Sequence, residues 1–226
     1  MKPILFNAEM VRAILDGRKT VTRRIIKPQP LDTPIVFYNP EEGMNIVCHV
    51  EGMDVLLNYF PPYQPGDVLW VRETWCKYGK LDDSDHLIEG TEKYYYRADG
   101  ENPTPFNDFL VQHPGWDEHR ETPVWRPSIH MPHDAARIFL RVKEVRVERL
   151  NDIDNLSALD EGFDGRCSTP ADGALSDWQQ NYDFSVEKFA SAWDRTVKPA
   201  DRAIYGWDAN PWVWVIEFER VKNEDE

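Results

Sequence analysis

From residue 14 to residue 24 the chain reads ILDGRKTVTRR, and this stretch carries the strongest clue to the fold. Ile14 and Leu15 complete an apolar stripe typical of a helix face, and Gly17 is a residue that commonly ends helices. Cationic residues crowd together after that stop: Arg18, Lys19, Arg23, Arg24 and Lys27. Thr20 and Thr22 lie among them. The pattern predicts a helix–strand junction that forms a local anion site beside candidate nucleophiles.

Outside this segment the chain is acidic. Its 226 residues include 40 Asp and Glu against 26 Lys and Arg, a formal net charge of −14. Proteins that bind duplex DNA tightly neutralise many phosphates with basic side chains spread over a surface. We therefore expect no extensive duplex DNA binding. A nucleoside, a nucleotide or a short single-stranded segment remains compatible with one small basic segment.

Composition indicates a packed intracellular protein. Hydrophobic residues make up 41% of the chain and aromatic residues 12%, enough for a sizeable core. Cys48, Cys76 and Cys167 lie far apart, which favours reduced thiols over a disulfide frame or a zinc site. No segment has the roughly 20 apolar residues of a membrane span, and the N-terminus lacks a signal-peptide pattern. These features predict a cytoplasmic location and no membrane contact, and they give no indication of the oligomeric state.

Regular patterns are concentrated toward the two ends of the chain and predict an α+β fold of short strands with a few helices. In the expected strand 137–150, the apolar positions switch parity at Lys143-Glu144, which indicates a bulge or a sharp coil. The other expected elements are a helix at 8–16 capped by Asn7, a strand at 68–71, a short helix at 154–161 ended by Gly162, a helix starting at Ser185 and a strand at 212–219.

The segment from about 77 to 127 lacks such periodicity, apart from a hairpin expected near 93–98. It is rich in acids, prolines and aromatic residues, among them Tyr94–Tyr96, Trp116 and Trp125. Long irregular segments in compact domains usually serve as lids or binding loops. We expect this insertion to lie beside the Lys19 segment and to select substrates. The alternative is a structural plate or an oligomer contact on the far side.

Several short blocks stand in order along the chain: 10–24, 65–71 (PGDVLWV), Met131-Pro132 before the strand 138–149, 148–153 (ERLNDI), 158–162 (ALDEG) and 210–218 (NPWVWVIEF). Taken in this order, they resemble the ASCH domain, a PUA-like family, and in particular the longer ASCH proteins of phages and prophages. The resemblance implies one PUA-like (ASCH) β-barrel domain over residues 1–226, with a few flanking helices and the long insertion at about 77–127.

Some small bacterial members of this family are metal-independent amidohydrolases that remove the acetyl group from N(4)-acetylcytidine. They use a lysine, a threonine three residues later and a distant glutamate. Carried over by motif, these catalytic roles fall on Lys19, Thr22 and Glu161. The resemblance implies a hydrolase that needs no cofactor and acts on a modified nucleoside. The family also contains RNA-binding modules and ribonucleases, so the alternatives are a non-catalytic binder of single-stranded or modified RNA, or a ribonuclease. Candidate substrate-binding residues are Arg18, Arg23, Arg24, Glu73, Trp116 and Trp125.

The chemistry places demands on each residue. A threonine hydroxyl becomes a nucleophile only when a base takes its proton, and lysine acts as that base only with a lowered pKa. The neighbouring arginines would lower the pKa of Lys19. Glu161 falls at a helix C-terminus, where the dipole disfavours a carboxylate, so it could pass a proton to a leaving amine or form an ion pair with Lys19.

Two other interpretations of these residues stay open. The basic segment could be a solvated surface cluster, with Thr20 and Thr22 as ordinary strand residues and Glu161 as a surface glutamate. Glu73, just after the strand 68–71, is an alternative carboxylate for the site.

Histidines give no firm metal site. His130 and His133, with His113 and His119, show loose ligand spacing but no carboxylate at a signature distance. We interpret them as loop residues and predict no metal centre.

Overall fold

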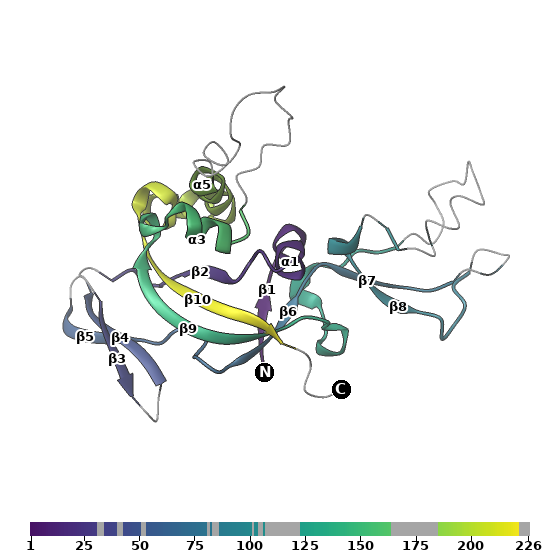
Figure 1. Cartoon of the computed structure of the whole chain (residues 1–226), viewed down its shortest axis with the longest axis horizontal. Coiled ribbons are helices and arrows are strands. Elements are labelled where there is room, and N and C mark those ends of the chain that lie inside the picture. Colours follow the sequence, from purple (N-terminus) through teal and green to yellow (C-terminus); the bar gives the residue numbers. More distant parts are fainter. Residues whose placement is uncertain are drawn as a thin grey trace, which may run out of the picture. The chain divides into compact units, whose positions relative to one another are not determined.

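The computed structural model has a mixed α+β fold (Figure 1). It describes residues 1–30, 34–39, 43–50, 53–80, 82, 86–100, 102–103, 106, 123–163 and 185–221. The strands are β1 (Lys2–Leu5), β2 (Val21–Ile25), β3 (Ile35–Asn39), β4 (Gly43–Val50), β5 (Met53–Tyr59), β6 (Val68–Arg72), β7 (Trp75–Tyr78), β8 (Lys93–Tyr96), β9 (Phe139–Arg149) and β10 (Trp212–Val221). The α-helices are α1 (Ala8–Leu15), α3 (Asn155–Asp160), α5 (Ser185–Thr196) and α6 (Arg202–Tyr205). The 3-10 helices are η1 (Arg97–Asp99), η2 (Ser128–His130), η3 (His133–Ala135), η4 (Leu150–Asp152), η5 (Pro199–Asp201) and η6 (Trp207–Ala209).

The largest sheet has the hydrogen-bonded strand order β1-β6-β9-β10-β2. β1 pairs with β6 in parallel, and β10 pairs with β2 antiparallel. β3-β4-β5 form a second, antiparallel sheet, and β7 and β8 a hairpin. The strands that the structure describes do not close into a barrel, because β1 and β2 remain the two edges of the largest sheet. The expectation of α+β architecture is confirmed, and the expected closed barrel is not seen in these residues.

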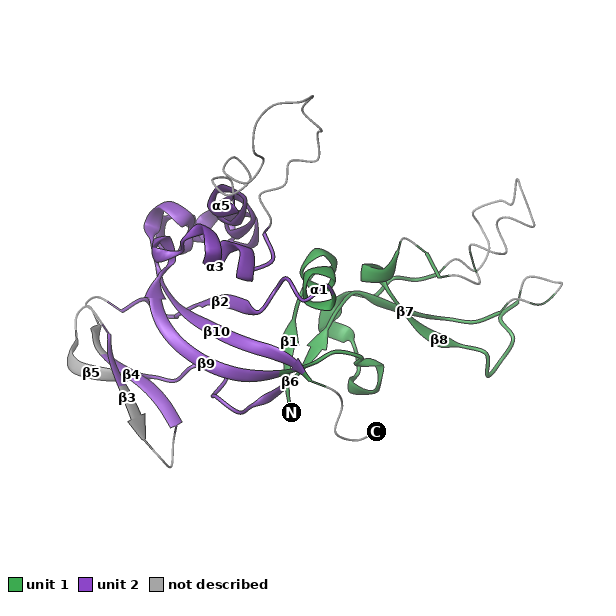
Figure 2. Cartoon of the chain, viewed as in Figure 1, with its two compact units in different colours: residues 1–15, 69–140, 221–226 green, residues 16–68, 141–220 purple. Residues whose placement is uncertain are grey.

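The chain divides into two compact units, coloured separately in Figure 2. Unit 1 consists of 1–15, 69–140 and 221–226, and unit 2 of 16–68 and 141–220. The chain passes from one unit to the other inside β6 and again inside β9.

Unit 1 contains α1, β1 and the β7–β8 hairpin. Asn7 caps α1, because its Oδ1 accepts a hydrogen bond from the Met10 backbone N at 2.9 Å. Residues 93–96 form one strand, β8, rather than a whole hairpin near 93–98, and the partner strand β7 includes Lys77 and Tyr78, which the sequence placed in the irregular insertion. The cross-strand pairing therefore shortens the irregular segment at its beginning.

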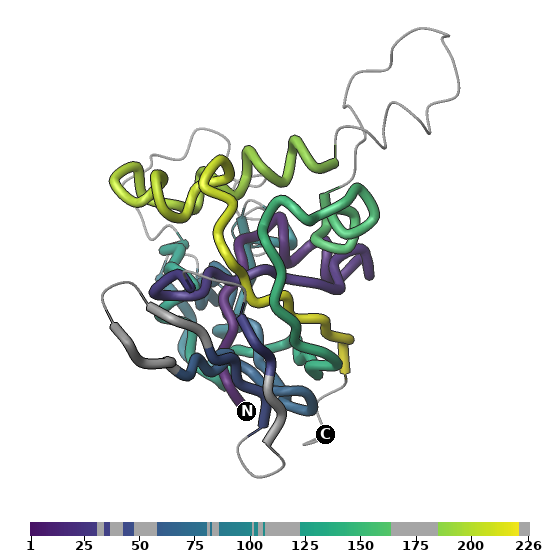
Figure 3. Tube along the Cα trace, turned by 90° about the vertical axis from the view of Figure 1, so that its left-hand side faces the viewer, coloured from purple at the N-terminus to yellow at the C-terminus, as the bar shows by residue number. Residues whose placement is uncertain are grey.

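Unit 2 buries one face of β2 and β10 under helices. Val21 packs in an apolar cluster with Val213 and Val215 of β10 and with Phe189 and Trp193 of α5. In Figure 3 the helical segment 185–209, coloured green to yellow, forms a layer above the strands of this unit. Because strand side chains alternate, the even-numbered residues of β2 and β10 point to the opposite face.

Local signals in the sequence match the structure closely. Gly17 has φ of +72°, a conformation that glycine adopts without strain, and it turns the chain out of α1. Along β9, Val142 and Val145 are buried while the two residues between them are exposed. The burial pattern of β9 thus follows the parity switch seen in the sequence.

Candidate functional site

The candidate site is built on the outer edge of β2. The Phe218 backbone N donates to Thr20 O at 2.9 Å, and the Ile26 N donates to Trp212 O at 3.2 Å. The even-numbered residues of this segment therefore hydrogen-bond to β10, so the carbonyls of Val21 and Arg23 point toward the edge without a partner strand. Lys19 and Glu161 form an isolated antiparallel bridge there.

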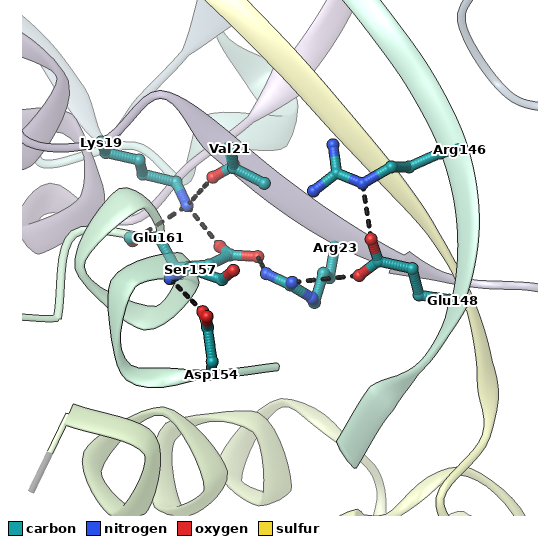
Figure 4. Close-up of polar contacts among 8 residues, drawn as sticks. All are labelled: Lys19, Val21, Arg23, Arg146, Glu148, Asp154, Ser157 and Glu161. Atoms are coloured by element: carbon teal, nitrogen blue, oxygen red, sulfur yellow. Dashed lines mark hydrogen bonds and ion pairs between the residues drawn. The ribbon is translucent and has the colours of Figure 1, made fainter. Parts of the chain in front are cut away.

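Lys19 is buried at this edge, with 2% of its surface exposed. Its Nζ donates to Glu161 Oε2 at 2.6 Å, to Glu161 O at 3.0 Å and to Val21 O at 2.7 Å (Figure 4). A lysine ammonium has three protons to donate. The recorded contacts satisfy all three, so the resting structure holds Lys19 as an ion-paired ammonium.

Glu161 is the C-cap residue of α3, followed by Gly162 with φ of +91°. The residue is 3% exposed, and its two carboxylate oxygens have different partners. Oε2 accepts from Lys19, whereas Oε1 accepts from Arg23 Nη1 at 3.3 Å. Asp154 begins the same helix as its N-cap, since its Oδ1 accepts from the Ser157 backbone N at 2.8 Å. The N-cap and the C-cap of the short helix α3 therefore both help to position the Glu161 carboxylate.

The ion-pair network continues across β9. Arg23 Nη2 contacts Glu148 Oε2 at 3.3 Å, and Arg146 Nε donates to the other oxygen of Glu148. The network therefore alternates cation and anion from Lys19 through to Arg146, as drawn in Figure 4. Lys19 and Arg23 of the cationic segment are therefore paired with the protein's own carboxylates.

Burial dominates the electrostatics of Lys19. Desolvation lowers the pKa of Lys19 most strongly; the Glu161 carboxylate opposes this, and the Arg24 and Arg23 charges lower the pKa further. The sequence-based expectation of a lowered pKa is supported, although burial is a larger cause than the neighbouring arginines. Desolvation also lowers the pKa of Arg24, against the opposing influence of Tyr63 and Glu161.

Thr22 is buried in β2, with 4% of its surface exposed, directly opposite Ile216 of β10. Strand alternation places it on the face opposite Val21 and Arg23. The peptide carbonyl that joins Val21 to Thr22 accepts the 2.7 Å bond from Lys19 Nζ. Lys19 therefore touches the backbone of Thr22's neighbour, and the role of Thr22 as nucleophile stays a prediction.

The structure excludes the solvated-surface interpretation for the central residues. Lys19, Arg23 and Glu161 are all buried, whereas Arg18 and Lys27 are exposed. Arg18 pairs with Asp16 at 2.9 Å and donates to Gly162 O at 3.1 Å. It therefore borders the site without entering the buried network.

Other predicted residues belong to unit 1. Glu73 is buried and makes a two-pronged ion pair with Arg137, with N–O distances of 2.9 and 3.0 Å. Trp125 is half-buried, with the Arg97 guanidinium 5.2 Å from its ring centroid. Trp116 lies outside the described residues. The substrate-binding roles of these three residues, and the position of the insertion beside Lys19, stay predictions.

No metal centre is evident in the described ranges, where no group of three His, Cys, Asp or Glu is arranged to hold an ion. His133 packs its ring edgewise against Trp70 at 5.1 Å and against Phe139 at 6.3 Å. His113 and His119 are not among the described residues.

Sequence reasoning missed Glu148 and Arg146. Both lie in a strand that the sequence predicted, and their spacing of two puts them on one face. Two opposite charges spaced two residues apart in a half-buried strand were the sequence signal that could have predicted this ion pair.

No family model, no curated protein and no solved structure matches the chain significantly. Among the helices in the described ranges, none combines the length and the apolar character that crossing a lipid bilayer requires.

Proposed function

We propose that this protein is an amidohydrolase that removes an acyl group from the exocyclic amine of a modified cytidine nucleoside or a related base. The observation that carries the proposal is the buried pair of Lys19 and Glu161. These residues are 142 positions apart in the chain, and their side chains meet at 2.6 Å. A lysine and a carboxylate so placed form a proton-transfer pair at the only edge of β2 that no strand covers in the described part of the sheet.

Transfer of one proton from Lys19 Nζ to Glu161 Oε2 converts the ion pair into a neutral amine and a carboxylic acid. Burial of Lys19 favours its neutral form, because desolvation penalises the ammonium. The positive charges of Arg23 and Arg24 favour removing the proton from Lys19. The pair then holds a base and an acid at adjacent positions.

In the first half-reaction the Lys19 amine takes the proton of the Thr22 hydroxyl as Oγ1 attacks the acyl carbon. The carbon–nitrogen bond breaks, and the Glu161 carboxylic acid gives its proton to the departing exocyclic amine. Lys19 and Glu161 are thereby returned to their charged forms, and the acyl group is held as an ester on Thr22.

In the second half-reaction water attacks this ester after the same proton shift between Lys19 and Glu161. Lys19 takes a proton from the water, and Glu161 returns one to Thr22 Oγ1. The carboxylic acid product leaves, and the resting ion pair re-forms. Substrate binding must break the contact of Lys19 with Val21 O so that Nζ can turn toward Thr22.

Membership of the ASCH group of PUA-like proteins is part of this proposal. Its support is the ordered set of sequence blocks, together with the agreement between the lysine and glutamate that those blocks select and the pair found at the edge of β2. The family's metal independence and lack of cofactor are proposed on the same ground.

The experiment is incubation of the protein with a panel of acylated cytidines, with and without a chelator, followed by chromatographic detection of the free nucleoside. The proposal expects release of cytidine from at least one panel member at a rate that the chelator does not change. Binding of single-stranded RNA without any product would instead favour a non-catalytic reader, and cleavage of RNA would favour a ribonuclease.

A further inference from the structure

Unit 2 contains a pocket that neither the sequence motifs nor the catalytic proposal uses. It has a volume of about 400 Å³, within the range of small-molecule sites. Three of its walls are aromatic: Trp214 of β10, Tyr59 at the end of β5 and Phe60 just after it. The remaining lining residues are Ile26, Lys27, Pro28 and Asn58.

The pocket lies on the same face of the sheet as Thr22. In the register between β10 and β2, Trp214 is opposite Arg24 and Ile216 is opposite Thr22. Directly opposed residues of antiparallel strands share a face, and one step of two residues along a strand is about 7 Å. Trp214 is therefore one such step from the Thr22 pair, on the face that α3 and α5 do not cover.

The chemistry of the walls selects a planar ring. Trp214 is buried, whereas Phe60 is 54% exposed. Aromatic side chains stack on nucleobases because every base presents a π-face. The Asn58 Oδ1 accepts from Asn45 at 3.2 Å, which orients the Asn58 amide so that its NH₂ group can donate to the polar edge of a base.

Lys27 is one of the residues that line the pocket. Its Nζ lies 4.5 Å from the centroid of the Tyr205 ring, a cation–π contact on the side of the helix-covered cluster. The ammonium would have to leave Tyr205 to meet a sugar hydroxyl or a 5′-phosphate of a ligand in the pocket.

We propose that this pocket is the nucleobase subsite, where the pyrimidine ring of the substrate binds against Trp214 and Phe60 on the sheet face that also carries Thr22. The assignment of the ring as the substrate's base rests on the proposed hydrolase function. The binding of a planar nucleobase rests only on the pocket.

The test is calorimetric titration of the full chain with cytidine, in wild type and in Phe60→Ala. Phe60 is exposed, so its truncation leaves the core intact, and loss of one stacking partner should weaken cytidine binding about tenfold. The matched control is Leu156→Ala, which truncates a side chain of similar exposure, 57%, on α3 at the opposite face of the sheet. It should bind cytidine like wild type.

Titration with cytidine 5′-monophosphate distinguishes a nucleoside from a nucleotide ligand. If the Lys27 charge binds a phosphate, Lys27→Ala should weaken the binding of cytidine 5′-monophosphate and leave the binding of cytidine unchanged. Equal affinity of wild type and Phe60→Ala for cytidine, or no binding of cytidine by wild type, would overturn the pocket assignment.

The two proposals fail in different ways. If acylcytidine is hydrolysed and Phe60→Ala leaves KM unchanged, the subsite is wrong and the hydrolase stands. If cytidine binds in a Phe60-dependent manner and no acylcytidine is hydrolysed, the pocket stands and the hydrolase is wrong.

Discussion

Lys19 combines two properties that seldom occur together, complete burial and three satisfied ammonium donors. Breaking a buried ion pair by removing one partner typically costs about 3–5 kcal/mol of stability. A substitution of Lys19 therefore affects both the stability of the fold and the catalytic activity. Variants that keep the shape of the side chain, such as Lys19→Met and Glu161→Gln, are the informative ones.

The lowered pKa of Lys19 predicts a pH profile. The mechanism needs the one proton that Lys19 and Glu161 share, and the lowered pKa of Lys19 means that this proton is lost below the ordinary lysine value of 10.5, so kcat/KM should fall with rising pH along a limb centred below that value. Because the Arg24 charge lowers the pKa of Lys19, Arg24→Met should raise it and move the limb to higher pH. Initial rates measured across pH on an acylcytidine substrate check this.

The matched control for that profile is Arg195→Met, since Arg195 lies on the exposed surface of α5 and bonds only within its own helix among the contacts recorded for the described residues. An unshifted limb in Arg24→Met, or an equal shift in the control, would contradict the assignment of Lys19 as the base.

Cys76 gives a second prediction at the residue scale. It is fully buried in β7, and burial raises the pKa of its thiol to about 11. With Cys48→Ser and Cys167→Ser in place, iodoacetamide at neutral pH should leave the native protein unmodified and alkylate it fully after denaturation. Mass spectrometry reads the result. Rapid alkylation of the native protein would show that the β7–β8 hairpin opens readily.

At the scale of elements, α3 is short enough for its caps to matter. The Asp154 carboxylate satisfies the Ser157 N–H at one end, and Glu161 ends the helix at the other. Asp154→Ala should lower the free energy of unfolding by about 1 kcal/mol and slow hydrolysis by loosening Glu161. Asp154→Ser, which keeps a capping oxygen, should restore both. Urea denaturation and initial rates provide the measurements. An unchanged hydrolysis rate in an Asp154→Ala variant that is destabilised would contradict the role of α3 in positioning Glu161.

Local elements were predictable because their signals are local. Asn7, Gly17 and Gly162 mark helix boundaries through capping and backbone conformation, and these are properties of neighbouring residues. The parity switch in β9 was likewise readable from the apolar positions alone.

Long-range arrangement was less predictable. Hydrophobic periodicity does not determine which strands pair. The partner strand of β8 and the open sheet edges at β1 and β2 therefore could not be predicted from the sequence. The pairing of Lys19 with Glu161 was anticipated through the family resemblance, whereas Glu148 and the pocket at Phe60 and Trp214 arise from segments distant in the chain.

At the scale of the whole molecule, charge predicts weak binding to duplex DNA. The net charge is −14, and two of the crowded cations, Lys19 and Arg23, are buried and paired with internal carboxylates. Fluorescence anisotropy with a labelled duplex should therefore show low affinity and a shallow salt dependence. Tight binding that falls steeply with salt would contradict this distribution of charge.

Burial also changes what an arginine substitution tests. The sequence alone makes Arg23 and Arg24 the residues whose replacement by Ala would remove residual oligonucleotide binding. Arg23 is 4% exposed and bonded to Glu161 and Glu148, so its replacement also removes buried ion pairs, and its role in oligonucleotide binding stays a prediction. Its replacement should therefore lower stability.

The most direct test of the central claim is the rate of deacylation of N(4)-acetylcytidine by four variants compared with wild type: Lys19→Met, Thr22→Val, Glu161→Gln and the double variant Lys19→Met/Glu161→Gln. Each single change should reduce kcat at least about a hundredfold in protein that circular dichroism shows to be folded. The double variant should be little slower than the slower of its two singles, because groups that act as one unit lose activity non-additively. Wild-type rates in any folded single variant, or no turnover by wild type, would contradict the account.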